Sequence, residues 1–177
     1  MGVTRKQAEN IASVLSEGMP YIQRFYGKII VVKYGGAAMS DVSLKKGFAR
    51  DIALMKLVGM KPVIVHGGGP QIAKELKKAG VTSDFNSGLR ITDQSTMAVV
   101  KKVLGIKVNH EISTLISKSG ALSKGLNYKN SEIVRASKLI GEYGLDLGLV
   151  GKVDKIKTRD IKNLLSGLMA PIESEVF

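Results

Sequence analysis

The most informative segment of this chain is Pro62-Val63-Ile64-Val65-His66-Gly67-Gly68-Gly69-Pro70-Gln71-Ile72. A β-branched run comes first, three consecutive glycines follow, and a helical pattern begins after them. Glycine has no Cβ, so the backbone there can come very close to a ligand. Pro70 is tolerated in a first helical turn. The stretch predicts a strand that ends in bare backbone N–H groups at a helix N-terminus, a geometry suited to phosphate or carboxylate.

A second glycine turn, Lys33-Tyr34-Gly35-Gly36, follows the β-branched run Ile29-Ile30-Val31-Val32. Residues 29–33 are expected to form a fully buried, parallel strand. Two glycine turns at strand ends, one of them led by a lysine, indicate a site for an anionic substrate and a phosphate.

The rest of the chain fits an α/β order with connections long enough for right-handed crossovers. Hydrophobic periodicity predicts an N-terminal helix that Gly18-Met19-Pro20 breaks or kinks, and a long helix that Thr92 or Asp93 caps and Gly105 weakens locally. In contrast, Glu173 to Phe177 is not typical of the end of a sheet. The predicted helices are 5–17, 43–58, 70–79, 93–118 and 158–165, and the predicted strands are 29–33, 62–65, 121–126, 132–136 and 147–156.

Composition narrows the possible classes of protein. The 177 residues are 44% hydrophobic, which is enough for one domain with a proper core. No apolar run approaches the length of a membrane span, and the absence of cysteine fits a cytoplasmic protein. The net charge of +12 permits nucleic-acid binding, but the lysines are spread along the chain. A solvated surface that attracts acidic metabolites is the favoured interpretation, with no nucleic-acid or membrane partner.

Two nucleotide-binding motifs and a metal site are excluded by spacing. Ile72 occupies the third glycine position of a dinucleotide fingerprint, and the chain has no Gly-x-x-x-x-Gly-Lys-Ser/Thr run. Asp41, Asp51 and Asp93 lack the spacing of metal ligands, so no metal-ligating residue is assigned.

Five motifs in order together resemble the acetylglutamate kinases of the amino acid kinase family. The resemblance covers residues 8–172 and implies a three-layer αβα sandwich with a mainly parallel sheet. The five motifs are Lys33-Tyr34-Gly35-Gly36, His66-Gly67-Gly68-Gly69-Pro70, Gly88-Leu89-Arg90-Ile91-Thr92-Asp93, Gly105-Ile106-Lys107-Val108-Asn109 and Asp146-Leu147-Gly148-Leu149-Val150-Gly151.

The resemblance also implies an activity and a set of roles. The family transfers the γ-phosphoryl group of ATP, bound with Mg²⁺, to the side-chain carboxylate of N-acetyl-L-glutamate, a step of arginine biosynthesis. Lys33 corresponds to the lysine that stabilises the transition state, although a lysine at a strand end is more often a plain surface charge. Arg90 corresponds to the arginine that pairs with the substrate α-carboxylate. Gly68 and Gly69 correspond to substrate-binding glycines, and Gly35, Gly36 and Gly67 to phosphate-binding ones.

Residues 1–27 resemble the N-terminal helix of the arginine-inhibited, hexameric members, in which this helix links dimers and helps to form the arginine site. That resemblance implies a homo-oligomer and arginine as an inhibitor. A helix packed on its own domain is the alternative. Residues 28–177 then form the N-acetylglutamate-binding lobe.

Members of the family run about a hundred residues longer, and their C-terminal half binds most of the nucleotide. The sequence therefore predicts either the amino-acid-binding half of a kinase, inactive alone, or a non-catalytic homologue that binds an acylated amino acid or arginine, or only oligomerises.

Overall fold

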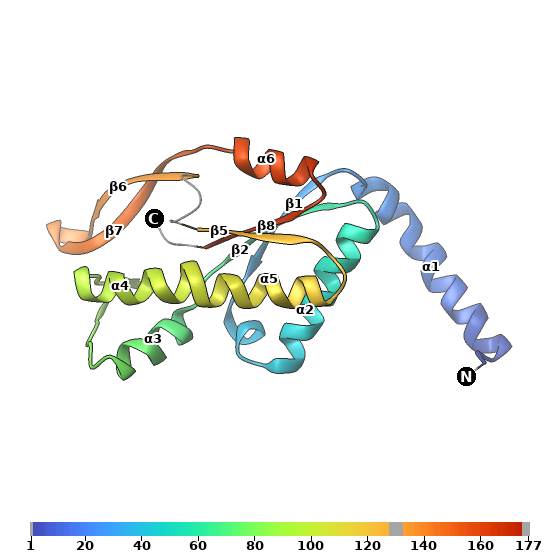
Figure 1. Ribbon diagram of the computed structural model, residues 1–177, viewed down its shortest axis with the longest axis horizontal. Helices are drawn as coiled ribbons and strands as arrows, with labels where there is room; N and C mark the ends of the chain where they lie inside the picture. The colour runs from blue at the N-terminus through green and yellow to red at the C-terminus, as the bar shows by residue number, and fades with distance from the viewer. Residues whose placement is uncertain (1, 128–132, 175–177) are drawn as a thin grey trace.

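A computed structural model describes residues 2–127 and 133–174 (Figure 1). The chain begins with a long helix and then alternates strands and helices. Its helical segments are α1 (Arg5–Phe25), η1 (Gly36–Met39), α2 (Val42–Leu57), α3 (Gly69–Lys78), α4 (Gln94–Lys102), η2 (Val103–Val108), α5 (Asn109–Lys118), η3 (Glu142–Gly144) and α6 (Arg159–Ser166). Its strands are β1 (Ile29–Tyr34), β2 (Lys61–His66), β3 (Phe85–Asn86), β4 (Leu89–Arg90), β5 (Ser123–Leu126), β6 (Val134–Ile140), β7 (Asp146–Ile156) and β8 (Ala170–Ser174).

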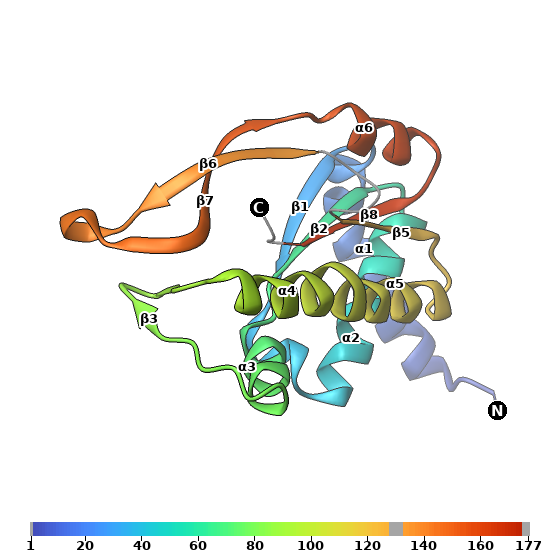
Figure 2. The same ribbon diagram turned by 60° about the vertical axis from the view of Figure 1, so that its left-hand side comes forward.

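The central sheet has the order β1-β2-β8-β5, and all of its strand pairs are parallel. Helices α2, α3 and α5 lie on one side of this sheet and α6 lies on the other (Figures 1 and 2). The expected α/β architecture with a parallel sheet is confirmed. Because the strands are parallel, all of their carboxyl ends lie at one edge of the sheet. The connections that leave this edge lead to helices on opposite faces. Folds of this kind bind ligands at such an edge.

The main core lies between the sheet and the helical segments α2, α3, α4, η2 and α5. Ile64 and Ile172 are paired across β2 and β8 and are fully buried. The helices contribute Ile52, Val103, Leu104, Val108, Ile112 and Ile116 to the same cluster. This packing fixes the edge of the sheet at which β2 and β8 end.

Strand β1 is parallel as predicted, but the expectation that it is fully buried is wrong. The exposed fractions are 54% for Ile29 and 66% for Val31, whereas Val32 packs against the core. The reason is that β1 forms the end of the described sheet and is covered on the α2 face, so its side chains alternate between core and surface.

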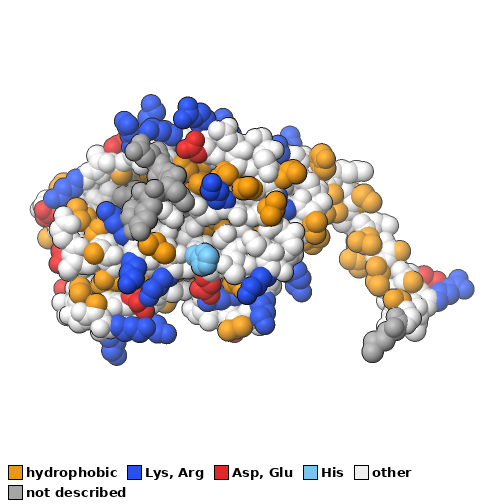
Figure 3. Space-filling view, viewed as in Figure 1, with side chains coloured by type: hydrophobic (Ala, Val, Ile, Leu, Met, Phe, Trp, Pro, Cys, Tyr) orange, Lys and Arg blue, Asp and Glu red, His pale blue; other side chains and the backbone are white. Residues whose placement is uncertain are grey.

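Helix α1 runs without interruption from Arg5 to Phe25, so of the two alternatives for Gly18-Met19-Pro20, a break or a kink, the break is wrong. Proline removes one intrahelical hydrogen bond, and a capping box between Thr4 and Gln7 secures the first turn of the helix. None of its residues is buried. Figure 3 shows hydrophobic side chains along this helix, which projects from the body.

The long helix predicted after Asp93 is present as α4, η2 and α5 in succession. Asp93 is its N-cap and accepts a hydrogen bond of 2.7 Å from the backbone N–H of Thr96, and this bond lowers the pKa of the aspartate. The segment η2, which contains Gly105, is a π-helix. The predicted local weakness is therefore a change of helical pitch, a feature frequent at functional sites.

The expectation that Glu173 and the residues after it do not end a sheet is wrong for Glu173 and Ser174. Glu173 and Ser174 belong to β8, which lies between β2 and β5 in the interior of the sheet. Pairing on both sides supplies the hydrogen bonds that the local sequence alone does not indicate. The expected strand at 132–136 begins at Val134, and residue 132 lies outside the described residues.

Candidate functional site

The two glycine turns are neighbours in space. Strand β1 pairs with β2 so that Tyr34 lies opposite His66, and the backbone N–H of Gly67 donates to the carbonyl of Tyr34 at 3.3 Å. The side-chain amide of Gln71, in the first turn of α3, donates to the carbonyl of Met39 at 3.2 Å. These two bonds hold the loop after β1 against the start of α3.

The glycines of the turns differ in what surrounds them. A Cβ built on Gly35, Gly36 or Gly69 meets no atom within 4 Å, so these three positions border open space. A Cβ on Gly68 comes within 2.5 Å of the Leu104 side chain in the π-helix. Gly68 therefore lets α3 pack closely against η2, while the others leave room for a ligand.

Lys33 is exposed on β1, immediately before the first turn. Its neighbour Tyr34 points into the core, stacks on Phe48 with ring centroids 3.8 Å apart, and donates from its hydroxyl to the carbonyl of Ala38 at 2.8 Å. Burial raises the pKa of Tyr34 to about 12, so this hydroxyl stays a hydrogen-bond donor. Tyr34 thus anchors the glycine loop that follows β1 to the core.

Arg90 lies on the short hairpin of β3 and β4. Ser87 and Gly88 form its two-residue turn with φ of 47° and 81°, as a type I′ hairpin requires. The guanidinium lies over the Phe85 ring at 4.4 Å and donates to the hydroxyl of Ser83 at 3.2 Å. Within residues 2–127 and 133–174, Arg90 forms no ion pair with a carboxylate.

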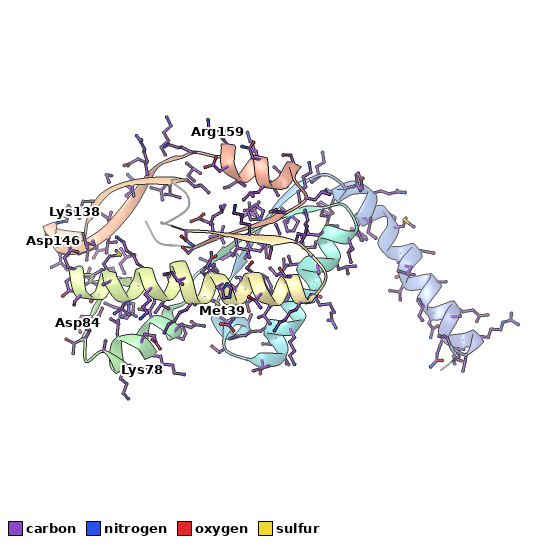
Figure 4. All side chains as sticks on the ribbon, in the orientation of Figure 1. Met39, Lys78, Asp84, Lys138, Asp146 and Arg159 are labelled. Atoms are coloured by element: carbon purple, nitrogen blue, oxygen red, sulfur yellow. The ribbon has the colours of Figure 1, made fainter. Side chains whose placement is uncertain are left out.

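A cavity of about 1000 Å³ lies beside the sheet edge, between α4 and the hairpin of β6 and β7. Thr92 joins the two walls, because its N–H donates to Leu147 and its carbonyl accepts from Leu149 at 2.7 Å. At the outer end of the hairpin, Lys138 and Asp146 form an ion pair of 2.8 Å (Figure 4). The lining includes Asp93, Met97, Lys101, Asn127, Ile133, Arg135, Gly148 and Glu173.

The structure brings together some of the predicted site residues and leaves one apart. Lys33 and the two glycine turns lie at the ends of adjacent strands. Arg90 lies on the separate hairpin and is connected to the cavity through Thr92, whose hydroxyl donates to the Arg90 carbonyl at 2.8 Å. The described lining of the cavity includes none of these predicted residues.

A buried polar cluster beneath the site was missed by sequence reasoning. Asn109, at the end of the π-helix, donates from Nδ2 to the carbonyls of Leu126 and Ile172, each at 3.1 Å. The same nitrogen is 3.4 Å from Nε2 of His66, whose Nδ1 is 3.0 Å from the carbonyl of Gly67. The cluster joins β2, β5 and β8 directly below the glycine turn. The one indication in the sequence was that Asn109 ends the motif Gly105-Ile106-Lys107-Val108-Asn109.

Glu173 was also missed, because the sequence does not indicate that β8 enters the sheet. Its side chain lines the cavity, and its Oε2 is buried with no hydrogen-bond partner among the described residues. Burial raises the pKa of this carboxyl group to about 7, against a smaller opposing effect of the Ser174 backbone N–H.

The described part of the chain lacks two features. None of its helices combines the length and apolar character that a membrane crossing requires. Its histidine, aspartate and glutamate side chains form no cluster of three that could ligate a metal ion.

The amino-acid sequence of this chain is similar to those of known proteins. The model of the amino acid kinase family matches residues 28–175. The acetylglutamate kinase of Hydrogenovibrio crunogenus is 49% identical over 99% of this chain and 62% of the relative. That of Ruthia magnifica is 54% identical over 92% of this chain and 57% of the relative. The chain thus spans about three fifths of the length of these curated relatives.

Solved structures share the fold. The structure of smu.665 from Streptococcus mutans superimposes with a TM-score of 0.73 at 30% sequence identity. The match covers 82% of this chain and 58% of the smu.665 chain. N-acetylglutamate synthase from Neisseria gonorrhoeae, solved with coenzyme A and N-acetyl-glutamate, gives a TM-score of 0.78 at 20% identity over 92% of this chain and 37% of its own. On the family match and the curated relatives together, this chain belongs to the amino acid kinase family.

Proposed function

We propose that this chain binds N-acetylglutamate and forms the amino-acid-binding part of an acetylglutamate kinase. One observation carries the proposal: two glycine turns, hydrogen-bonded to each other, end adjacent parallel strands beside a large cavity. The names of the curated relatives supply the substrate.

Each site residue has a proposed role that fits its surroundings. The amides of Gly68 and Gly69, at the start of α3, receive the reacting carboxylate, since a helix N-terminus favours anions. Arg90 takes the α-carboxylate with its planar fork. Gly35 and Gly36 border the space for a phosphate. The amide of Gly67 is engaged by Tyr34, so Gly67 contributes by holding the two turns together.

The chemistry places modest demands on this part of the molecule. A γ-carboxylate with a pKa of about 4.3 is ionised at neutral pH, so the nucleophile needs no general base. The protein must hold two anions together and offset the charge that develops on the transferring group. Lys33, exposed beside the first glycine turn, is proposed for that task. ATP with Mg²⁺ is the proposed phosphoryl donor, and its phosphates fit the open space at Gly35 and Gly36.

A thermal-shift series tests the function. A ligand that binds only the folded state raises the melting temperature. We expect N-acetylglutamate to raise it and unacylated glutamate to raise it less, and we expect a Lys33→Met variant to retain the response because Lys33 is proposed to act on the transferred phosphate. No response to N-acetylglutamate at millimolar concentration contradicts the proposal.

A second candidate is a binding module without turnover, because the proposed contacts of Gly68, Gly69 and Arg90 hold the amino acid rather than the nucleotide. The two candidates differ in acyl phosphate formation from ATP and N-acetylglutamate, measured by hydroxylamine trapping. Trapped product above the level of the Lys33→Met variant supports the kinase, whereas binding without product supports the module. Arginine belongs in the thermal-shift series as the proposed inhibitor.

We propose that residues 1–27 serve assembly rather than the site. Ile11, Leu15 and Met19 recur at helical spacing on α1, and their side chains are 53%, 61% and 51% exposed. We expect the double variant Ile11→Glu/Leu15→Glu to have a lower mass than the native chain in light scattering, because charges oppose burial of this stripe. Asn10→Glu, on the same helix, is the matched control. Equal masses for the double variant and the native chain contradict the assembly role.

A further inference from the structure

The register of the sheet places Glu173 in one row with Lys33. Lys33 pairs with Val65, and Val65 pairs with Glu173 on the next strand. Residues in register on parallel strands project to the same face, and two strand spacings amount to about 10 Å. Glu173 therefore occupies the same face of the same edge as the proposed catalytic lysine, and it lines the cavity.

The carboxyl group of Glu173 is poorly suited to carry a charge there. Its Oε2 is buried, and among the described residues no group donates a hydrogen bond to it. An ionised carboxylate in such a place is costly, so the neutral acid is favoured. Burial accordingly raises the pKa of the group to about 7.

The charges that face the cavity indicate which ligand enters it. Helix α4 contributes Lys101 and Asp93, and β6 contributes Arg135 and Lys138. Asp93 is engaged as a helix cap and Lys138 is paired with Asp146. Apart from Glu173 itself, the remaining lining residues are uncharged, and they include Asn127 after β5, Thr92 and Gln94 at the start of α4, and Gly148–Gly151 in β7. Because basic groups outnumber acidic ones, an anion is favoured, and its charge raises the pKa of Glu173 further.

We propose that Glu173 is a proton-linked ligand contact: a carboxylate-bearing ligand enters this cavity together with one proton, which Glu173 shares with a ligand oxygen. This inference rests on the proposed function, since N-acetylglutamate is the ligand for which it is argued. The neutral carboxylic acid donates O–H to the ligand oxygen, and no covalent bond forms or breaks. The ionised form repels the same ligand.

The test is calorimetry of N-acetylglutamate binding to the native chain and to Glu173→Gln. For the native chain, we expect the dissociation constant to rise about tenfold between about pH 6 and about pH 8, with roughly half a proton taken up per site near pH 7. Proton uptake is obtained by comparing buffers with different ionisation enthalpies. Glu173→Gln, which keeps a neutral donor, should bind with the same constant across this range. Glu9→Gln, exposed on α1, should keep the native profile.

The outcomes separate this inference from the proposed function. Binding that tightens with pH, or that is independent of pH in the native chain, overturns the role of Glu173 and leaves the proposed function standing. Retention of the native pH profile by Glu173→Gln does the same. Absence of binding at every pH contradicts both. NMR titration of ¹³C-glutamate-labelled protein, assigned with Glu173→Gln, reads the protonation directly and should show a midpoint near neutrality that rises when ligand is added.

Discussion

Arg90→Ala is expected to weaken N-acetylglutamate binding by at least about 100-fold, because a bidentate, charge-assisted contact with a carboxylate contributes about 3 kcal/mol or more. The guanidinium is already held by the Phe85 ring and the Ser83 hydroxyl, so little side-chain entropy is lost when a ligand binds. Isothermal titration calorimetry measures the change.

Two further variants make this result specific. Arg90→Lys keeps the charge and loses the planar fork, so we expect it to recover only part of the affinity. Arg50→Ala removes the same charge from an exposed position on α2, where the side chain is 79% accessible, and should bind as the native chain does. Native affinity in Arg90→Ala would remove Arg90 from the site, and a thermal melt of the same variant verifies that it is folded.

Asn109→Leu is expected to lower the free energy of unfolding by about 3–5 kcal/mol, because leucine has nearly the same size but cannot donate hydrogen bonds. The carbonyls of Leu126 and Ile172 then lose their donor within the interior, and Nε2 of His66 loses a polar neighbour. Urea denaturation measures the loss. Asn163→Leu, on the exposed side of α6, is the matched control and should change stability by less than about 1 kcal/mol.

Gly125 offers a second test of the same cluster. A Cβ built on Gly125 lies 1.7 Å from Oδ1 of Asn109, so Gly125→Ala forces the two residues apart. In an Asn109→Ala background the space is vacated, and the same glycine substitution should cost much less. A double-mutant cycle therefore gives a coupling free energy. Additive effects would show that Asn109 and Gly125 do not share this space.

Local rules accounted for much of the chain. The β-branched runs before each glycine turn became β1 and β2, Asp93 capped the long helix, and Gly105 lay within its altered turn. These outcomes depend on residues close together in sequence, where backbone freedom, side-chain branching and capping act directly. The family resemblance extended the same motifs to proposed roles for Lys33, Arg90 and the glycines.

Errors arose where a distant segment decided the outcome. Exposure of Ile29 and Val31 depends on what lies beside β1, which is the end strand of the described sheet. The entry of β8 between β2 and β5 created the positions of Glu173 and of the carbonyl that Asn109 binds. The sequence around Glu173 or Asn109 does not indicate that β8 lies between β2 and β5.

Neighbouring residues set most of the helices and strands and both glycine turns, because turn geometry, capping and periodicity are local properties, and the five ordered motifs carried the resemblance to the family. Only the tertiary structure decided that the turns are joined through Tyr34 and Gly67, that Asn109 connects three strands below them, and that an acid on β8 faces the cavity. The physical reason is that burial, and with it the protonation of Glu173 and the hydrogen bonds of Asn109, depends on which strands become neighbours across more than a hundred residues of chain.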